Sequence, residues 1–105
     1  MPGIDINYFI RQANKLTEKL EQRKKELADE KVEGKAGDGR VVATANGLQE
    51  LTSLKIDPQV IDPKDPAMLE DLVMAAVNAA LTQSKNHMQT ELSKISGGVK
   101  IPGLT

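Results

Sequence analysis

Apolar residues in the first thirty positions recur at the spacing of one helical face. Steps of three and four residues separate most of them, which predicts one helix over residues 5–30, with Asp5 near its start. The apolar positions are Ile6, Phe9, Ala13, Leu16, Leu20 and Leu27. Charge interrupts this face at Arg23 and Glu30, so we expect the first half to pack in the core and the second half to be exposed or loosely paired. Such a helix would be roughly 37 Å long, so part of it should project.

Short β-rich runs separated by glycines follow, over residues 31–57. The Asn-Gly pair at 46–47 predicts a type I′ hairpin, because both central residues of that turn need positive φ. The Gly-Asp-Gly run at 37–39 predicts a looser first turn. The expected strands are residues 31–36, 40–46 and 48–57.

The alternation of side chains along these strands predicts one apolar face of the sheet. Val41, Ala43 and Ala45 share one face of the second strand, and Leu54 and Ile56 share one face of the third. Three antiparallel strands form a sheet too small to be stable alone, so a helix should lie across it.

A second helix is predicted after an acidic connector. Residues 58–64 form that connector, because the Asp-Pro pairs within and beside it break regular structure. Asp65 suits the N-cap and Pro66 the first helical position, so we expect a helix over residues 65–96, ended by a Gly-Gly pair. Residues 97–105, rich in Gly and Pro, should form a flexible tail.

The first half of this second helix is apolar on nearly every side. A helix covered only by its own sheet needs a single apolar stripe, so the excess predicts a second copy of the chain as further cover. The predicted dimer interface comprises Leu69, Leu72, Val73, Ala76, Val77, Ala80 and Leu81. The alternative is a monomer that leaves its small alanines exposed.

Composition limits the classes of protein that remain. A chain of 105 residues indicates one domain, residues 1–105, of class α+β and order α-β-β-β-α. The absence of Cys excludes disulfides, thiolate metal sites and a cysteine nucleophile. No apolar run is long enough for export or membrane spanning, so we expect a soluble, cytoplasmic protein. The two aromatic residues, Tyr8 and Phe9, argue against a single-strand reader that stacks bases on rings.

Two sets of polar residues could bind nucleic-acid phosphates. One set recurs every four residues along the first helix and forms a basic ridge: Arg11, Lys15, Lys19 and Arg23, extended by Lys24 and Lys25. The other lies in the distal second helix: Lys85, Asn86, Gln89 and Lys94. Cationic side chains along one element can contact a DNA backbone without reading bases. The alternative is a solvated face joined by ion pairs, because acids and bases are equal in number across residues 5–30.

Signals for catalysis are weak. The "GKAGDGR" segment lacks a Gly-Lys-Ser/Thr ending and leads into a strand, so a hairpin is preferred over a phosphate loop. His87 is the only histidine, and we expect it to be an exposed helix residue without metal or base function. Glu70 and Asp71 suit the helix dipole better than paired-carboxylate chemistry. We therefore expect no enzyme, no metal, no cofactor and no small-molecule substrate.

Several segments together resemble the YbaB/EbfC family of bacterial nucleoid-associated proteins. They are "IRQANKLTEKLEQ", "VEGKAGDGRV", "NG", "LKIDP", "MLEDLVMAAVNAAL" and "SGGVKIPG", in the family's order and spacing. The resemblance implies an α-β-β-β-α protomer and an intertwined homodimer whose helical arms are arranged like tweezers. It also implies binding of double-stranded DNA by those arms with loose sequence preference, a place in the cytoplasmic nucleoid, and roles in nucleoid organisation and gene regulation.

A protein of a different class remains as the alternative function. Projecting helices beside a small sheet also suit a prefoldin-like adaptor or holdase that binds protein chains and not DNA. That function would need exposed apolar residues at the tips of the arms, whereas the sequence places mostly charged and amide residues in the expected distal halves of both helices.

Overall fold

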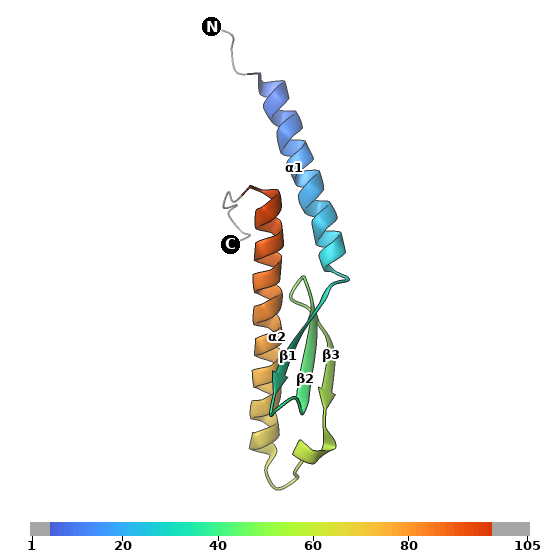
Figure 1. Ribbon diagram of the computed structural model, residues 1–105, viewed down its shortest axis with the longest axis vertical. Helices are drawn as coiled ribbons and strands as arrows, with labels where there is room; N and C mark the ends of the chain where they lie inside the picture. Colours follow the sequence, from blue (N-terminus) through green and yellow to red (C-terminus); the bar gives the residue numbers. More distant parts are fainter. Residues whose placement is uncertain (1–4, 98–105) are drawn as a thin grey trace.

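The computed structural model describes residues 5–97 and shows an elongated α+β protomer (Figure 1). It measures 78 Å along its longest axis and 20 and 16 Å across. The elements, in order, are α1 (Ile6–Leu27), β1 (Lys31–Ala36), β2 (Val41–Asn46), β3 (Leu51–Ile56), a short 3-10 helix (Pro58–Val60) and α2 (Pro66–Ile95). The predicted α-β-β-β-α order is confirmed. Beyond Gly97, the expected flexible tail lies outside the described residues.

Side-chain caps fix where both helices begin. The Asp5 carboxylate accepts a hydrogen bond from the Tyr8 backbone N–H at 3.1 Å, and α1 starts one residue later. The Asp65 carboxylate accepts from the Met68 N–H at 3.2 Å, and Pro66 takes the first position of α2. Beyond the end of α2, Gly97 has a φ of +67°, a conformation that glycine adopts without steric cost.

The three strands form an antiparallel sheet in the order β1-β2-β3, with α2 across one face (Figure 1). Val41, Ala43 and Ala45 of β2 are fully buried beneath α2, which confirms the predicted inner face. Gly34 of β1 makes this close packing possible, because a Cβ there would overlap the α2 backbone and lie 2.9 Å from the carbonyl carbon of Ala79. The core is therefore thin, and small residues set its thickness.

The connection between β2 and β3 differs from the predicted type I′ hairpin. Asn46 ends β2 and has no positive φ, whereas Gln49 does, at 64°. The Asn46 side-chain oxygen accepts from the N–H groups of Leu48 and Glu50 at 2.9 and 3.1 Å. These bonds satisfy the loop backbone locally, so β3 begins at residue 51 and not at 48. Gly47 instead binds the C-terminal end of α1, because its N–H donates a hydrogen bond to the Leu27 carbonyl at 2.8 Å.

The end of α1 that packs against the sheet is the opposite of the one expected from its apolar pattern. Its C-terminal end is at the sheet, where Leu27 is fully buried, and its N-terminal half projects past the end of α2 (Figure 1). Ile6 and Phe9 are 67% and 58% exposed. The expected core-packed first half was therefore wrong, because only three residues separate α1 from β1 and this short link holds the other end at the sheet.

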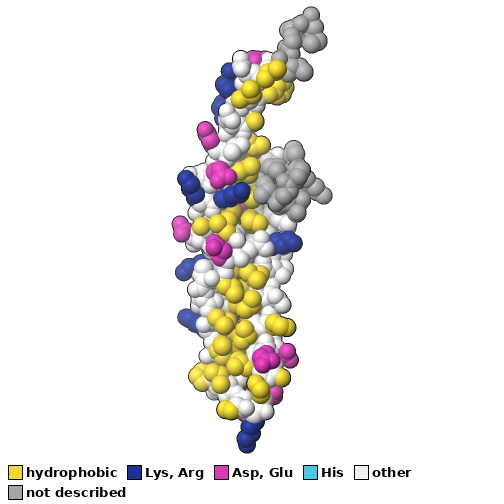
Figure 2. Space-filling view, turned by 180° about the vertical axis from the view of Figure 1, so that it is seen from behind, with side chains coloured by type: hydrophobic (Ala, Val, Ile, Leu, Met, Phe, Trp, Pro, Cys, Tyr) yellow, Lys and Arg dark blue, Asp and Glu magenta, His cyan; other side chains and the backbone are white. Residues whose placement is uncertain are grey.

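One side of α2 is covered by the sheet and another is open. Ala76 and Ala80 are fully buried against β1 within the protomer, so the sheet of their own chain already covers them, and their place in a dimer interface stays a prediction. The other five predicted interface residues pack against the core and keep part of their surface: Leu69, Leu72, Val73, Val77 and Leu81. Met74 is 61% exposed, and apolar side chains follow much of the long axis in Figure 2.

Candidate nucleic-acid interface

Cations of the predicted ridge lie along the projecting helix α1. Arg11, Lys15 and Lys19 are exposed, and within residues 5–97 none of them forms an ion pair. Lys25 is also exposed and unpaired within that range, whereas Lys24 lies 3.8 Å from the Glu21 carboxylate. The N-terminal part of the ridge therefore offers free positive charge, which is what phosphate binding requires.

Arg23 belongs to the ridge by spacing but is engaged by carboxylates. Its guanidinium nitrogens lie 2.5 and 3.1 Å from the two carboxylate oxygens of Glu30, and 2.6 Å from an oxygen of Glu91 on α2. Only 18% of its side chain is exposed, and these partners raise its pKa further above its usual range. A DNA contact at Arg23 stays a prediction, and in the protomer Arg23 holds α1 against α2.

Two further residues complete this cluster between the helices. Lys94 donates to Glu91 at 2.6 Å, and His87 Nε2 lies 2.7 Å from a Glu30 oxygen. His87 is half-buried and not the exposed residue expected from the sequence. Hydrogen bonds from Lys94 and then from Arg23 lower the pKa of Glu91 to about 2, and hydrogen bonds from Arg23 and then from His87 lower the pKa of Glu30.

The pKa of Glu91 predicts how the stability of the protein depends on pH. Its folded pKa of about 2 lies below its ordinary value of 4.5, so its stabilising effect is complete above that value and is lost as the pH falls toward 2. A Glu91→Gln variant should therefore have a lower Tm than the wild type at pH 7 and a similar Tm near pH 2. Thermal unfolding followed by circular dichroism measures both. An equal difference at the two pH values would contradict this assignment.

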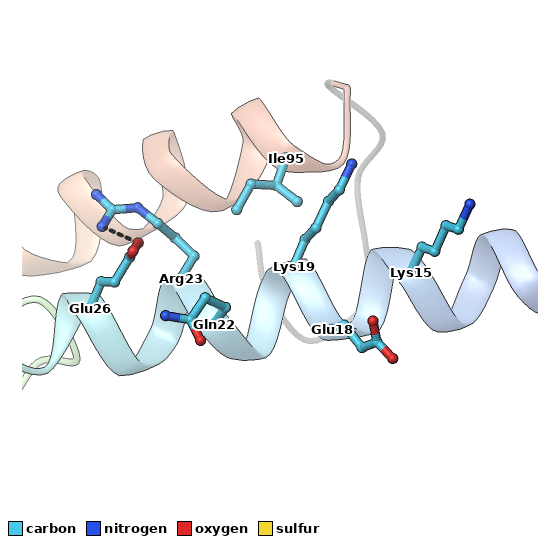
Figure 3. Close-up of a pocket in the computed structure, with 7 residues that line it drawn as sticks. All are labelled: Lys15, Glu18, Lys19, Gln22, Arg23, Glu26 and Ile95. Atoms are coloured by element: carbon cyan, nitrogen blue, oxygen red, sulfur yellow. Dashed lines mark hydrogen bonds and ion pairs between the residues drawn. The ribbon is translucent and has the colours of Figure 1, made fainter.

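A groove of about 400 Å³ separates the ridge from the last turns of α2 (Figure 3). Lys15, Lys19 and Arg23 point to the side on which α2 lies, and Ile95 faces them from α2. The groove is lined by Lys15, Glu18, Lys19, Gln22, Arg23, Glu26 and Ile95. The side chains of Lys15 and Lys19 thus lie on the side of α1 that faces the C-terminal end of α2.

The second predicted set, on α2, is only partly available. Lys85 and Asn86 are exposed, and Gln89 is half-buried. The charge of Lys94 is shared with Glu91. These positions continue the polar surface of α2 past the sheet, but they add less free positive charge than α1 does.

Sequence reasoning missed two kinds of residue that position these helices. Glu30 and Glu91 hold Arg23, and their residue types alone gave no sign of a contact that joins positions 68 residues apart. Ser84 is fully buried, donates to the Asn46 carbonyl at 2.6 Å and accepts from the Gln49 N–H at 2.8 Å. A signal for Ser84 existed, because it follows Ala76 and Ala80 at four-residue spacing on the buried face of α2.

The described residues contain neither a metal-binding cluster nor a membrane-spanning helix. Across residues 5–97, no three His, Asp or Glu side chains gather in an arrangement that could hold a metal ion. In the same range, neither helix is long and apolar enough to cross a membrane.

Comparison with known proteins places the chain in a family. The sequence profile of the YbaB/EbfC DNA-binding family, a family of binding proteins and not of enzymes, matches residues 1–99. A nucleoid-associated protein of Myxococcus xanthus is 70% identical over 105 residues, all of both chains, and one of Anaeromyxobacter dehalogenans is 46% identical over 96% of this chain and 98% of its own. An uncharacterized Helicobacter pylori protein of known crystal structure shares the fold, with a TM-score of 0.81 and 21% identity over 90% of this chain and 100% of that one. The profile match and these relatives show that the chain belongs to the YbaB/EbfC DNA-binding family.

Proposed function

We propose that this protein is a homodimeric, nucleoid-associated protein of the cytoplasm that binds double-stranded DNA with loose sequence preference. In this role it would contribute to nucleoid organisation and gene regulation. The observation that carries the proposal is the free positive charge of Arg11, Lys15 and Lys19 on a helix that projects from an elongated protomer. Such cations neutralise phosphates, and phosphate contacts give affinity that depends little on base sequence.

Family membership supports DNA as the partner, and related proteins are named nucleoid-associated. The overall net charge of −1 does not oppose this, because the excess of acid over base is concentrated at residues 57–71, away from the projecting part of α1. We keep Lys25, Lys85, Asn86 and Gln89 as further candidate contacts. Lys24 and Lys94 remain candidates whose charge is partly balanced by neighbouring carboxylates.

Binding to duplexes and single strands tests this function directly. We expect fluorescence anisotropy to show that several unrelated duplexes of about 30 base pairs bind with affinities within a few-fold of one another at low salt. Single strands of the same sequences should bind more weakly, because the chain has only two aromatic residues on which bases could stack. Failure to retain any duplex at low salt, or binding confined to one sequence, would contradict the proposal.

A second copy of the chain best covers the apolar surface that one protomer leaves open. Leu51 and Leu54 lie on the inner side of β3, opposite Ala45 and Ala43, yet they are 47% and 45% exposed, because α2 lies over β1 and β2. The N-terminal half of α1 is similarly open. A symmetric dimer would bury these surfaces and place two α1 helices together as a pair of arms.

The molar mass in solution tests the dimer. Light scattering at micromolar concentration should give twice the 11.4 kDa of one chain. Leu51→Glu together with Leu54→Glu should shift the mass toward one chain, whereas Lys64→Glu, on the exposed connector, should not. A wild-type mass near 11.4 kDa would contradict the dimer.

One observation favours a second candidate function, a holdase or adaptor for protein chains. Ile6, Tyr8, Phe9 and Ile10 are each at least 50% exposed at the projecting end of α1, which is the apolar arm tip that such a function requires. A dimer that pairs these ends would instead cover them. Suppression of the aggregation of an unfolded test protein, without duplex binding, would favour the holdase.

A further inference from the structure

The outer face of the sheet, turned away from α2, carries charge that neither helix uses. Strand alternation and the exposure pattern of β1 place Lys31, Glu33 and Lys35 on this face. Lys55 of β3 is on the same face, because it and Lys35 both pair with Val42 of the central strand. All three lysines are exposed.

The strand register fixes how these cations are spaced. Lys35 and Lys55 flank Val42 on opposite sides, so two strand spacings of about 4.8 Å separate their backbones by roughly 10 Å. Lys31 and Lys35 are four residues apart along β1, which corresponds to about 13 Å. The three ammonium groups therefore span about the length of four base-pair rises of 3.4 Å along a duplex.

A hollow of about 460 Å³ lies on this face, and two of the three lysines, Lys31 and Lys55, line it. Its lining consists of Lys31, Glu33, Val42, Thr44, Thr52, Ser53 and Lys55. Thr52 donates to the Thr44 carbonyl at 3.4 Å, and within residues 5–97 the hydroxyls of Thr44 and Ser53 make no hydrogen bond. The hollow thus offers hydroxyl donors between cations, and both kinds of group bind phosphate oxygens.

The charges of this face are not balanced by ion pairs. Within residues 5–97, neither the three lysines nor Glu33 takes part in a salt bridge. Arg23, by contrast, is held by two carboxylates that lie across from it. Glu33 is the only acid that lines the hollow, so positive charge exceeds negative charge there.

We infer that the outer sheet face binds the phosphate backbone of a second duplex DNA segment, apart from the one held by the arms. The inference rests on the proposed function, which supplies duplex DNA as the partner. Aromatic residues occur only at Tyr8 and Phe9, so this face cannot stack bases, and it exposes no large apolar side chain that would attract another copy. The sheet occupies the half of the molecule opposite the projecting end of α1 (Figure 1). One dimer could therefore link two duplexes.

Lysines on edge strands also have a purely structural role, which the test must separate from DNA binding. β1 and β3 are the edges of the sheet, and exposed lysines on edges prevent pairing with other chains. If that were their whole role, removal of the lysines would change aggregation and leave DNA capture unchanged. Glu33 provides the distinction, because a Glu33→Gln variant keeps every lysine.

A bridging assay tests the inference with the full-length protein. One duplex is fixed to beads, protein is bound to it, and capture of a second, fluorescent duplex is measured. The Lys31→Ala, Lys35→Ala, Lys55→Ala triple variant should lose about 10-fold or more of the second-duplex capture while binding the first duplex within about twofold of wild type. Glu33→Gln should raise capture about two- to fivefold, and Lys64→Ala, on the connector, should change nothing.

The outcomes separate the two proposals. Wild-type binding of the first duplex without capture of the second would overturn this inference and leave the proposed function intact. Unchanged capture by both the triple variant and Glu33→Gln would also overturn it. Failure of the wild type to bind even the first duplex would remove the proposed function and this inference together.

Discussion

Replacement of Gly34 with alanine should lower the free energy of unfolding by about 3 kcal/mol, because the added methyl group would collide with the backbone of α2. Its Cβ would overlap the carbonyl oxygen of Ala76 and the backbone nitrogen of Ala80, and both are main-chain atoms of α2. Relief would require the helix to move off the sheet, which would open the core around Ala43. Urea unfolding followed by circular dichroism gives the change in the free energy of unfolding.

Gly39→Ala is the matched control for this prediction. The chemical change is the same, and no atom lies within 4 Å of the added Cβ, but the φ of +84° disfavours any residue with a side chain. We expect a loss of only about 1 kcal/mol from that backbone preference. If the two variants lost the same stability, the close approach of α2 to β1 would not determine the thickness of the core.

Charge reversal on α1 should have the largest effect on function. The Arg11→Glu, Lys15→Glu, Lys19→Glu triple variant replaces free cations with repulsive charges on both arms of a dimer, and we expect duplex affinity to fall about 100-fold or more. The three side chains are exposed and unpaired within the described part of the chain, so the helix content and the mass in solution should stay unchanged. Fluorescence anisotropy with a labelled duplex measures the loss.

Lys64→Glu serves as the control for a general effect of net charge. Lys64 is an exposed residue of the connector before α2, and this connector lies at the end of the protomer away from the N-terminal half of α1 (Figure 1). Its charge reversal should reduce affinity less than threefold. Unchanged binding by the α1 triple variant would show that these three cations do not contact DNA. An equal loss in both variants would indicate attraction without a defined contact surface.

The elements of the fold were predictable because their signals are local. Apolar spacing and capping residues placed α2 within one residue at each end, and alternation identified the buried face of β2. The direction of α1 was not predictable in this way, because its most apolar half faces no core within its own chain. The short link from Leu27 to β1 determines which end meets the sheet, and this constraint outweighs the apolar pattern.

What the sequence did not reveal at the site also depends on contacts between distant positions. Four-residue spacing grouped Arg23 with Lys19, but it could not show that Glu91 lies across from Arg23 on the other helix. The prediction of a type I′ hairpin was wrong because the Asn46 side chain accepts hydrogen bonds from the loop backbone. The tendency of Asn and Gly to adopt positive φ does not reveal such bonds. The sequence also gave no sign that Gly34 lets the sheet pack directly against the α2 backbone at Ala76.

The most direct test of the central claim, that paired arms grip duplex DNA through its phosphates, is a salt titration of wild-type binding. The logarithm of the binding constant should fall linearly with the logarithm of salt concentration. The slope should be about −5 if Arg11, Lys15 and Lys19 of both α1 helices neutralise phosphates, because each neutralised phosphate contributes roughly −0.9. A flat response to salt, with duplex still bound, would contradict the claim.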